Sequence, residues 1–240
     1  MNAPRFFTDA PCSAGALVDL GAEDTNHATR VLRLHDGDAL VVINDGVAWD
    51  ATLRGSDSRQ PRAELTGRRD EQGGELPVAT TVIQAITKGT KFDDVVEKTV
   101  ELGARRIVPA MCERSYAQAG DAKIERWRRI ARAAAQQSRR RYIPVITAAA
   151  PWAHALALVR PTIVAYEDAP AGSFAQAVRE SGNAREIALA VGPEGGLAPA
   201  DVEAARAARC ALVSLGPTIL RTETAAAAML AALASTAGWW

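Results

Sequence analysis

The sequence predicts an α/β protein in which a small β-rich region precedes a larger domain built on a mostly parallel sheet. Two hydrophobic patterns carry this prediction. Up to about residue 70, short apolar runs lie close together between turn residues, which is typical of a small barrel or sandwich. From residue 77 onward, strand-length apolar runs alternate with helix-length segments. Such alternation favours strand–helix–strand units and therefore a parallel sheet.

In the first region, the clearest pattern is that of a β-hairpin. Residues 38–43 form an apolar run that ends at Asn44-Asp45-Gly46, and residues 47–53 then alternate apolar and polar side chains. Asn, Asp and Gly accept the backbone conformation of a tight hairpin turn. Residues 61–66 alternate again and predict a further strand. Residues 67–77 are rich in charge and contain a Gly-Gly pair, so they are the best candidate for a linker.

In the second region, strands and helices follow one another along the chain. Apolar runs predict strands at residues 78–86, 107–111, 162–166, 187–191 and 211–215. Helical periodicity and helix-end signals predict helices at residues 92–102, 121–138, 199–208 and 224–236. We expect Gly103 to end the first helix and Pro199 to lie in the first turn of the third. We expect Asp121 to cap the second helix, and Thr222 or Thr224 to cap the last.

Composition excludes several classes of protein. The chain has 240 residues, of which 48% are hydrophobic and 23% charged, so it can bury a core and is not predicted to be disordered. There is no apolar run of about 18 residues and no apolar leader, so we expect a cytoplasmic protein without a membrane span. Three cysteines and three histidines show no ligand spacing, which predicts neither disulfides nor a metal site: Cys12, Cys112, Cys210, His27, His35 and His154.

Net charge is zero, with 28 basic and 28 acidic residues, which by itself argues against a nucleic-acid-binding protein. The distribution is uneven, however, because residues 123–141 hold eight basic residues and one acidic residue. Helical spacing places Ile124, Trp127 and Ile130 on one face and most of the arginines on the other. This pattern predicts an amphipathic helix that binds phosphates through its guanidinium groups. The alternative is an ordinary solvated arginine face.

Two segments carry candidate chemistry, because each follows a predicted strand and precedes a predicted helix. The first is the Gly/Pro-rich loop within residues 188–197, and the second is residues 215–225, with polar side chains at a helix start. Loops at the carboxyl ends of parallel strands are where α/β sheets bind ligands. Neither segment is a Gly-x-Gly-x-x-Gly or Walker motif. The alternatives are a plain strand–helix turn and a helix cap with an Arg–Glu surface pair.

These residues resemble a known family. Val-Gly-Pro-Glu-Gly-Gly at 191–196, followed by Leu-Gly-Pro-x-Ile-Leu-Arg-Thr-Glu-Thr-Ala at 215–225, is similar to the bacterial 16S rRNA (uracil-N3)-methyltransferase family of the SPOUT superfamily. Further matches lie at His27-x-x-Arg30-Val31-Leu32-Arg33, Lys88-Gly89-x-Lys91, Lys98-x-x-Glu101-Leu102-Gly103 and Glu113-Arg114-Ser115. The chain departs from the family at Gln136-Gln137-Ser138-Arg139-Arg140, where an acid and a glycine are missing. This departure puts a catalytic role for Gln136 in doubt.

The resemblance implies a fold, a reaction and partners. Residues 1–72 are expected to form a PUA-like β-barrel that binds RNA, and residues 73–240 a SPOUT α/β domain with a deep trefoil knot. The family works as a homodimer and takes its methyl group from S-adenosyl-L-methionine. Its product is 3-methyluridine in the decoding region, so the implied partner is 16S rRNA or the small ribosomal subunit. Neither a metal nor a membrane is expected.

The resemblance also implies site residues. Arg221 is the candidate that stabilises the uracil anion, and Glu223 either orients Arg221, which is the favoured role, or accepts the N3 proton. The expected cofactor-binding residues are Tyr166, Glu167, Val191, Gly192, Pro193, Glu194, Gly195, Gly196, Leu215, Gly216, Ile219, Leu220, Thr222, Thr224 and Ala225. The expected RNA-binding residues are Arg30, Arg33, Lys88, Lys91, Arg114, Arg126, Arg129, Arg132, Arg139 and Arg140.

Three alternative functions stay open at this point. A non-catalytic RNA-binding ribosome assembly factor would keep the basic helix and lose cofactor binding. A nucleotide-dependent oxidoreductase would use the glycine loop, although the usual dinucleotide fingerprint is missing. A related knotted methyltransferase would act on another RNA, either tRNA or a ribose 2′-OH.

Overall fold

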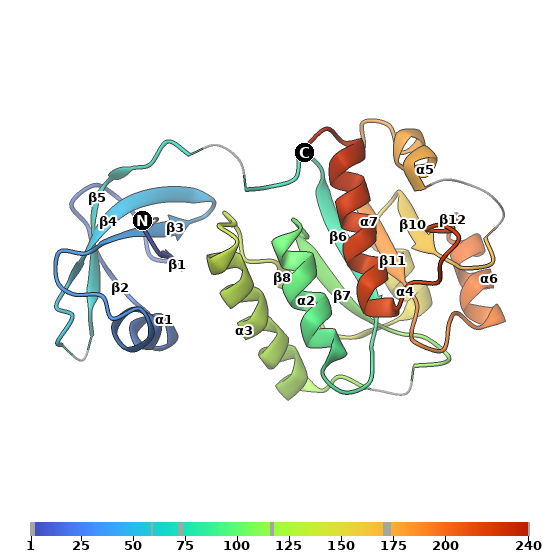
Figure 1. The fold of residues 1–240 in the computed structure, drawn as a ribbon, viewed down its shortest axis with the longest axis horizontal. Helices are drawn as coiled ribbons and strands as arrows, with labels where there is room; N and C mark the ends of the chain where they lie inside the picture. The colour runs from blue at the N-terminus through green and yellow to red at the C-terminus, as the bar shows by residue number, and fades with distance from the viewer. Residues whose placement is uncertain (1–2, 59, 72–73, 116–117, 170–173, 240) are drawn as a thin grey trace. The chain divides into compact units, whose positions relative to one another are not determined.

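A computed structural model of the protein describes residues 3–58, 60–71, 74–115, 118–169 and 174–239. The chain forms two compact units, each with its own sheet (Figure 1). The first unit contains residues 1–74 together with residues 135–142, and the second contains residues 75–134 and 143–240. Residues 72 and 73 of the predicted linker lie outside the described residues. The inclusion of residues 135–142 in the first unit was not predicted from the sequence.

The first unit is a five-stranded sheet with the predicted hairpin at its centre. Its strand order is β1 (Arg5–Phe7), β3 (Ala39–Asn44), β4 (Val47–Arg54), β5 (Arg62–Arg68) and β2 (Leu17–Asp19). The pairs β3–β4 and β4–β5 are antiparallel, and β1 runs parallel to β3. Asp45 and Gly46 both have positive φ angles, 44° and 74°, as the predicted tight turn requires. Strands β1 and β2 were not predicted, because three-residue strands show no periodicity.

Two short helices follow β2 in this unit, α1 (Ala22–Asn26) and the π-helix η1 (His27–Val31). Alternate residues of the strands, such as Leu40, Leu53 and Leu65, form the buried core with Phe6. The predicted β-rich region is therefore confirmed, with a helical segment that the sequence analysis did not anticipate.

Residues 135–142 belong to the first unit because their side chains bond to it. The Gln136 Nε2 donates a hydrogen bond to the buried Asp24 Oδ1 at 2.8 Å, and the Arg141 Nε donates to the Gly46 carbonyl oxygen at 2.9 Å. Arg140 is the largest fully buried side chain, at 1% exposure. Residues 135–142, at the end of the arginine-rich stretch, therefore pack into the first unit and bond to it.

The second unit is built on a parallel sheet, as predicted. Its strand order is β12 (Ala211–Val213), β10 (Thr162–Ala165), β11 (Glu186–Val191), β6 (Ala79–Ala85), β7 (Arg106–Met111) and β8 (Val145–Ile146), with β9 (Ala150–Pro151) also paired to β7. Every pairing among these strands is parallel. All five predicted strands of this region are present. Strands β8 and β9 are two residues long and were not predicted.

Helices cover both faces of this sheet. Strand residues alternate between faces, so Ile83 and Ala85 of β6 pack with the helices α4 (Trp152–Leu156) and α6 (Pro199–Ala207). Gln84, which lies between them, bonds instead to α7 (Thr222–Thr236) on the opposite face. Helix α7 packs in turn against α2 (Lys91–Glu101) and α5 (Phe174–Glu180) (Figure 1). The remaining helix, α3 (Asp121–Gln137), is the predicted basic amphipathic helix.

The predicted helix ends have mixed outcomes. Gly103 follows α2 with a φ of 103°, and Pro199 is the first residue of α6, as expected. Asp121 is the first residue of α3 and does not precede it as a cap. The prediction that Thr222 or Thr224 caps α7 is wrong, because Arg221 occupies the N-cap position without a side-chain hydrogen bond. The Thr222 hydroxyl has another partner, described below.

Candidate active site

A cleft of about 480 Å³ opens at the carboxyl edge of the parallel sheet. It is lined by the loops that follow the adjacent strands β12, β10 and β11, together with Lys91 at the start of α2, which follows β6. The carboxyl ends of parallel strands meet at one edge, so loops that are distant in sequence come together there. The volume lies in the range of small-molecule sites.

Nearly all residues predicted to bind the cofactor line this cleft. The exceptions are Gly195 and Thr224, and Thr224 is exposed on α7. Both catalytic candidates, Arg221 and Glu223, also line it. The cleft has further lining residues that the sequence analysis did not single out: Ala165, Asp168, Leu197, Ser214, Pro217 and Thr218. They could have been predicted, because each lies within one or two residues of a predicted site residue, at or after the end of a predicted strand.

Two walls of the cleft are joined by a buried hydrogen-bonded chain. The Thr222 Oγ1 donates to the Gly192 carbonyl oxygen at 2.6 Å and accepts from the Gln84 Nε2 at 2.8 Å. Thr222 is 7% exposed and Gln84 is fully buried. Gln84 was not predicted as a functional residue, although an amide inside the apolar run of β6 was visible in the sequence.

The loop after β11 has little free space around its backbone. A Cβ atom added at Gly192 would lie 2.8 Å from the Leu197 Cδ2, and Leu197 is buried. Gly196 has a φ of 71°, and a Cβ atom there would lie 2.9 Å from the Glu167 Oε1. The Asp201 carboxylate accepts the backbone N–H of Ala198 at 3.1 Å and thereby joins this loop to α6. Glycine is therefore favoured at position 196 by its positive φ angle and at position 192 by the close approach of the buried Leu197 side chain.

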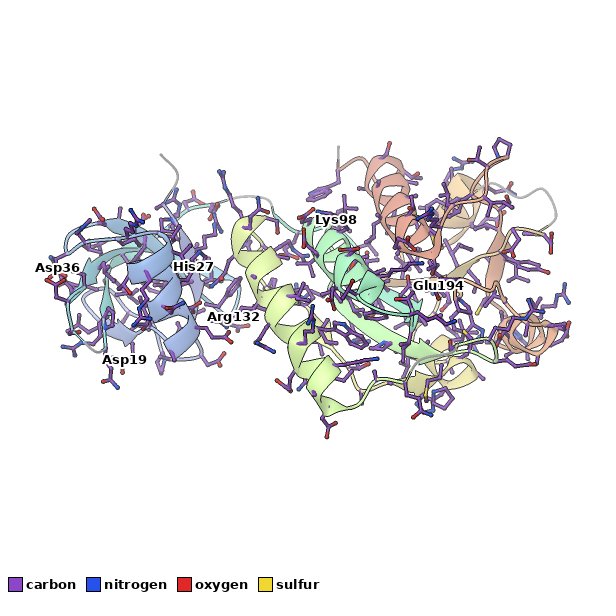
Figure 2. All side chains as sticks on the ribbon, turned by 60° about the horizontal axis from the view of Figure 1, so that its bottom comes forward. Asp19, His27, Asp36, Lys98, Arg132 and Glu194 are labelled. Atoms are coloured by element: carbon purple, nitrogen blue, oxygen red, sulfur yellow. The ribbon has the colours of Figure 1, made fainter. Side chains whose placement is uncertain are left out.

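Predicted RNA-binding cations surround the same loop. Glu194, labelled in Figure 2, accepts a hydrogen bond from the Lys88 backbone N–H at 3.1 Å and lies 3.6 Å from the Lys91 Nζ. The Arg114 Nη1 donates to the Gly195 carbonyl oxygen at 3.0 Å. Arg114 is exposed. Lys88 precedes α2, and Lys91 is the first residue of α2. These three side chains therefore lie beside the cleft.

Arg221 and Glu223 differ in their surroundings. Arg221 is exposed and forms no ion pair within the described part of the chain. Glu223 is half-buried, and its Oε2 atom is buried without a hydrogen-bond partner among the described residues. No hydrogen bond or ion pair joins the two side chains among the described residues. A buried carboxylate oxygen without a donor is costly.

The arginines of α3 have different roles. The Arg126 guanidinium donates twice to the Asp93 Oδ2, at 2.6 and 3.0 Å, and Asp93 also accepts from the Trp127 Nε1 at 3.0 Å. Arg128 pairs with Glu125. Arg129 is exposed and has no hydrogen bond or ion pair with any residue that the structure describes. Arg126 and Arg128 are therefore partly neutralised, and Arg129 is not.

A shallow groove of about 340 Å³ lies beside this face of α3. Arg128, Arg129 and Arg132 line it on one side and residues 143–146 on the other, with Val145 59% exposed. Arg132 is labelled on α3 in Figure 2. The prediction that Arg140 binds RNA is corrected, because a guanidinium that is 1% exposed does not reach a phosphate.

Three predicted cations belong to the first unit. Arg30 on η1 and Arg33, two residues after the end of η1, are exposed, as are the apolar side chains of Val31 and Leu32 between them. Arg139 is exposed and has a φ of 60°. These side chains are accessible to a nucleic acid on the surface of this unit.

The described residues contain no group of three or more His, Cys, Asp or Glu side chains arranged to hold a metal ion. No helix in the described ranges is both long enough and apolar enough to cross a membrane. Cys112 lies in the core of the second unit, and burial raises the pKa of its thiol far above the usual range, with Asp201 as a second cause. This thiol stays protonated and does not act as a nucleophile at neutral pH.

Comparison with known proteins assigns both units. Residues 74–234 match the family model of the RNA methyltransferase domain, and residues 20–66 match the RNA methyltransferase PUA domain. The chain belongs to this RNA methyltransferase family. The matches correspond to the parallel-sheet unit that contains the cleft and to the small β-rich unit.

Relatives in the family share the name ribosomal RNA small subunit methyltransferase E. The protein from Synechocystis sp. is 34% identical, and the alignment covers 90% of this chain and 72% of the relative. The protein from Bacillus subtilis is 30% identical, with coverage of 88% and 87%. The protein from Mycobacterium bovis is 32% identical, with coverage of 100% and 94%.

Solved structures agree with this membership. A ribosomal RNA small subunit methyltransferase E from Neisseria gonorrhoeae, bound to S-adenosyl methionine, superposes with a TM-score of 0.87 at 29% identity and covers 98% of both chains. A probable rRNA-methyltransferase from Porphyromonas gingivalis gives a TM-score of 0.79 at 28% identity, with coverage of 98% and 99%. The similarity therefore extends over nearly the whole chain.

Proposed function

We propose that this protein transfers a methyl group from S-adenosyl-L-methionine to N3 of a uridine in the 16S rRNA of the small ribosomal subunit. The observation that carries the proposal is the cleft formed by the loops 191–196 and 215–225. The structural relative from Neisseria gonorrhoeae was crystallised with S-adenosyl methionine, and relatives of similar length carry the name of a small-subunit rRNA methyltransferase.

The cleft suits the cofactor in size and chemistry. Its lining includes Gly192, Gly196 and Gly216, where the absence of a side chain allows the adenosine group to approach main-chain donors and acceptors closely. When bound, S-adenosyl-L-methionine supplies a methyl group that is already activated by its positively charged sulfur.

The residues of the chain must then make uracil N3 nucleophilic. N3 carries a proton, and its removal leaves negative charge on O2 and O4. The Arg221 guanidinium at the mouth of the cleft stabilises this charge once RNA covers it and excludes water. Glu223 accepts the N3 proton, because its Oε2 is an acceptor atom without a hydrogen-bond partner among the described residues. This role replaces the orientation of Arg221 that the sequence favoured.

RNA must also present the uridine unpaired, because N3 lies on the pairing edge of the base. Phosphates are held beside the cleft by Lys88, Lys91 and Arg114, and other phosphates by cations on α3 and on the first unit. The proposed contacts outside the cleft are Arg30, Arg33, Arg129, Arg132 and Arg139; Arg126 is left out because Asp93 already pairs with it. The homodimer, the trefoil knot and the cytoplasmic location remain predictions from the resemblance.

Primer extension on small-subunit rRNA tests the proposal. A base methylated at N3 does not pair, so it stops reverse transcriptase. A strain that lacks the gene should lose one stop in the decoding region, and the intact gene should restore it. An unchanged pattern of stops in the deletion strain would refute the assignment. Methyl transfer in vitro to tRNA, or to a ribose 2′-OH, would instead point to the related knotted enzymes.

A further inference from the structure

We infer that Gln84 is a positioning residue for the cofactor cleft, and that it acts through the Thr222 hydroxyl to hold the two cofactor loops at a fixed separation. This inference rests on the proposed function and deepens it. Gln84 lies inside β6, is fully buried, and has Ile83 and Ala85 as equally buried neighbours. An amide at such a site is unfavourable unless it forms hydrogen bonds.

The direction of the hydrogen-bonded chain is determined by its chemistry. A threonine hydroxyl has one hydrogen, and at 2.6 Å that hydrogen is donated to the Gly192 carbonyl oxygen. The Thr222 oxygen therefore acts as acceptor for the Gln84 Nε2 at 2.8 Å. The second amide hydrogen of Gln84 is donated to the Ala85 carbonyl oxygen at 3.1 Å. Both N–H groups of Gln84 are thus used, and the Thr222 hydroxyl is saturated as a donor.

Packing alone does not favour glutamine at this position. The Gln84 Oε1 atom is buried and has no hydrogen-bond partner among the described residues. A methionine of similar size would fill the same space without leaving an oxygen unpaired. The contribution of the amide is therefore its bond to Thr222, which joins the centre of the sheet to the start of α7 and to the loop after β11.

The hydrogen bonds from Gln84 to Thr222 and from Thr222 to Gly192 change how Thr222 is interpreted. Thr222 lines the cleft, but its hydroxyl hydrogen is donated to Gly192, so the hydroxyl cannot donate to a cofactor. Its role is to set the distance between two loops that both line the cleft. Other bonds to the same loop, from Arg114 and Lys91, are made by exposed cations and are weakened by water and salt. The hydrogen bonds of Gln84 and Thr222 are buried, so water and salt do not weaken this connection between the two loops.

Isothermal titration of S-adenosyl-L-methionine against variants of the full-length protein tests the inference. We expect Thr222→Val and Gln84→Met each to weaken binding by about tenfold, because both break the same chain. Thr222→Ser keeps the hydroxyl and should bind within about twofold of the unchanged protein. The double variant Gln84→Met/Thr222→Val should bind no more weakly than either single variant, since coupled residues are not additive.

Thr99→Val is the matched control. Thr99 is also fully buried and its Oγ1 donates to the Val95 carbonyl oxygen at 2.7 Å, but this bond lies within α2. Thr99→Val should lower the melting temperature about as much as Thr222→Val and leave cofactor affinity within about twofold. Equal losses of affinity in Thr99→Val and Thr222→Val would show that general stability is responsible, and would overturn the inference. So would unchanged affinity in Thr222→Val.

Hydrogen exchange in the absence of ligand separates the inference from the proposed function. If the unchanged protein does not bind S-adenosyl-L-methionine, the proposed function fails. The amides of residues 192 and 194–197 should still exchange faster in Gln84→Met and Thr222→Val than in Thr99→Val. Equal exchange in all of these variants would overturn the positioning role, whether or not the cofactor binds.

Discussion

The sequence is most informative in the two cofactor loops and in the arginine-rich stretch of residues 123–141. The loop residues come together at one site, whereas the arginines lie in different environments. The loops converge: thirteen of the fifteen predicted cofactor residues line one cleft. The arginines disperse. Arg126 pairs with Asp93 of α2, Arg140 is buried in the first unit, and Arg129 remains exposed without an ion pair in the described part of the chain.

The difference has a physical cause. The site in the loops depends on backbone geometry, and glycine, proline and the ends of buried strands specify that geometry locally. The meaning of a charged side chain depends on which charges lie beside it in space. The arginine-rich stretch contains one acidic residue, but an acidic partner comes from another segment. Asp93, which pairs with Arg126, lies 33 residues before it in the sequence. A count of charges within the stretch could not include it.

The largest expected effect tests the cleft itself. Arg221→Ala should reduce methyl transfer by about 100-fold or more, because it removes the cation that stabilises the developing anion. Affinity for S-adenosyl-L-methionine should stay within about threefold, since the exposed side chain has no ion pair within the described residues to lose. Single-turnover rates and titration calorimetry give both values. A transfer rate close to that of the unchanged protein would remove Arg221 from the mechanism.

An intermediate effect compares two glycines of one loop. Gly192→Ala places a methyl group 2.8 Å from the buried Leu197 side chain and should weaken cofactor binding by about tenfold. Gly195→Ala is the matched control, because its methyl group would lie 3.6 Å from the Arg114 Cβ, an ordinary contact, and Gly195 is outside the cleft lining. The loss of cofactor affinity in Gly195→Ala should stay within about threefold. Equal losses at both positions would contradict the claim that close packing shapes the loop.

The smallest expected effect compares two arginines of α3. Arg129→Gln should weaken RNA binding severalfold at low salt and reduce the slope of log affinity against log salt by about 1. Arg126→Gln removes a cation already paired with Asp93, so it should mainly lower the free energy of unfolding, by about 0.2–1 kcal/mol. Filter binding over a salt series and urea unfolding measure the two quantities. Equal salt slopes for both variants would show that ion pairing does not distinguish these arginines.

Much of the fold was predictable because long buried strands and amphipathic helices leave periodic patterns. The hairpin at residues 39–54, the parallel sheet and the helices α2, α3, α6 and α7 were all predicted. The short elements β1, β2, β8 and β9 were not, because two or three residues rarely show a period; the three-residue β12 was predicted only within the apolar run at residues 211–215. The helices α1, η1, α4 and α5 were missed for a similar reason, as each has seven residues or fewer.

By itself, the sequence determined that two loops with unusual backbone freedom follow buried parallel strands, and that one helix carries a row of arginines. These features depend on residue type and local order, and they are sufficient to indicate the family. Only the tertiary structure decided that Gln84, 138 residues before Thr222, supports the cleft, and that Arg140 is buried while Arg129 is exposed. Hydrogen bonds and ion pairs depend on distance in space, which the order of strands in the sheet sets.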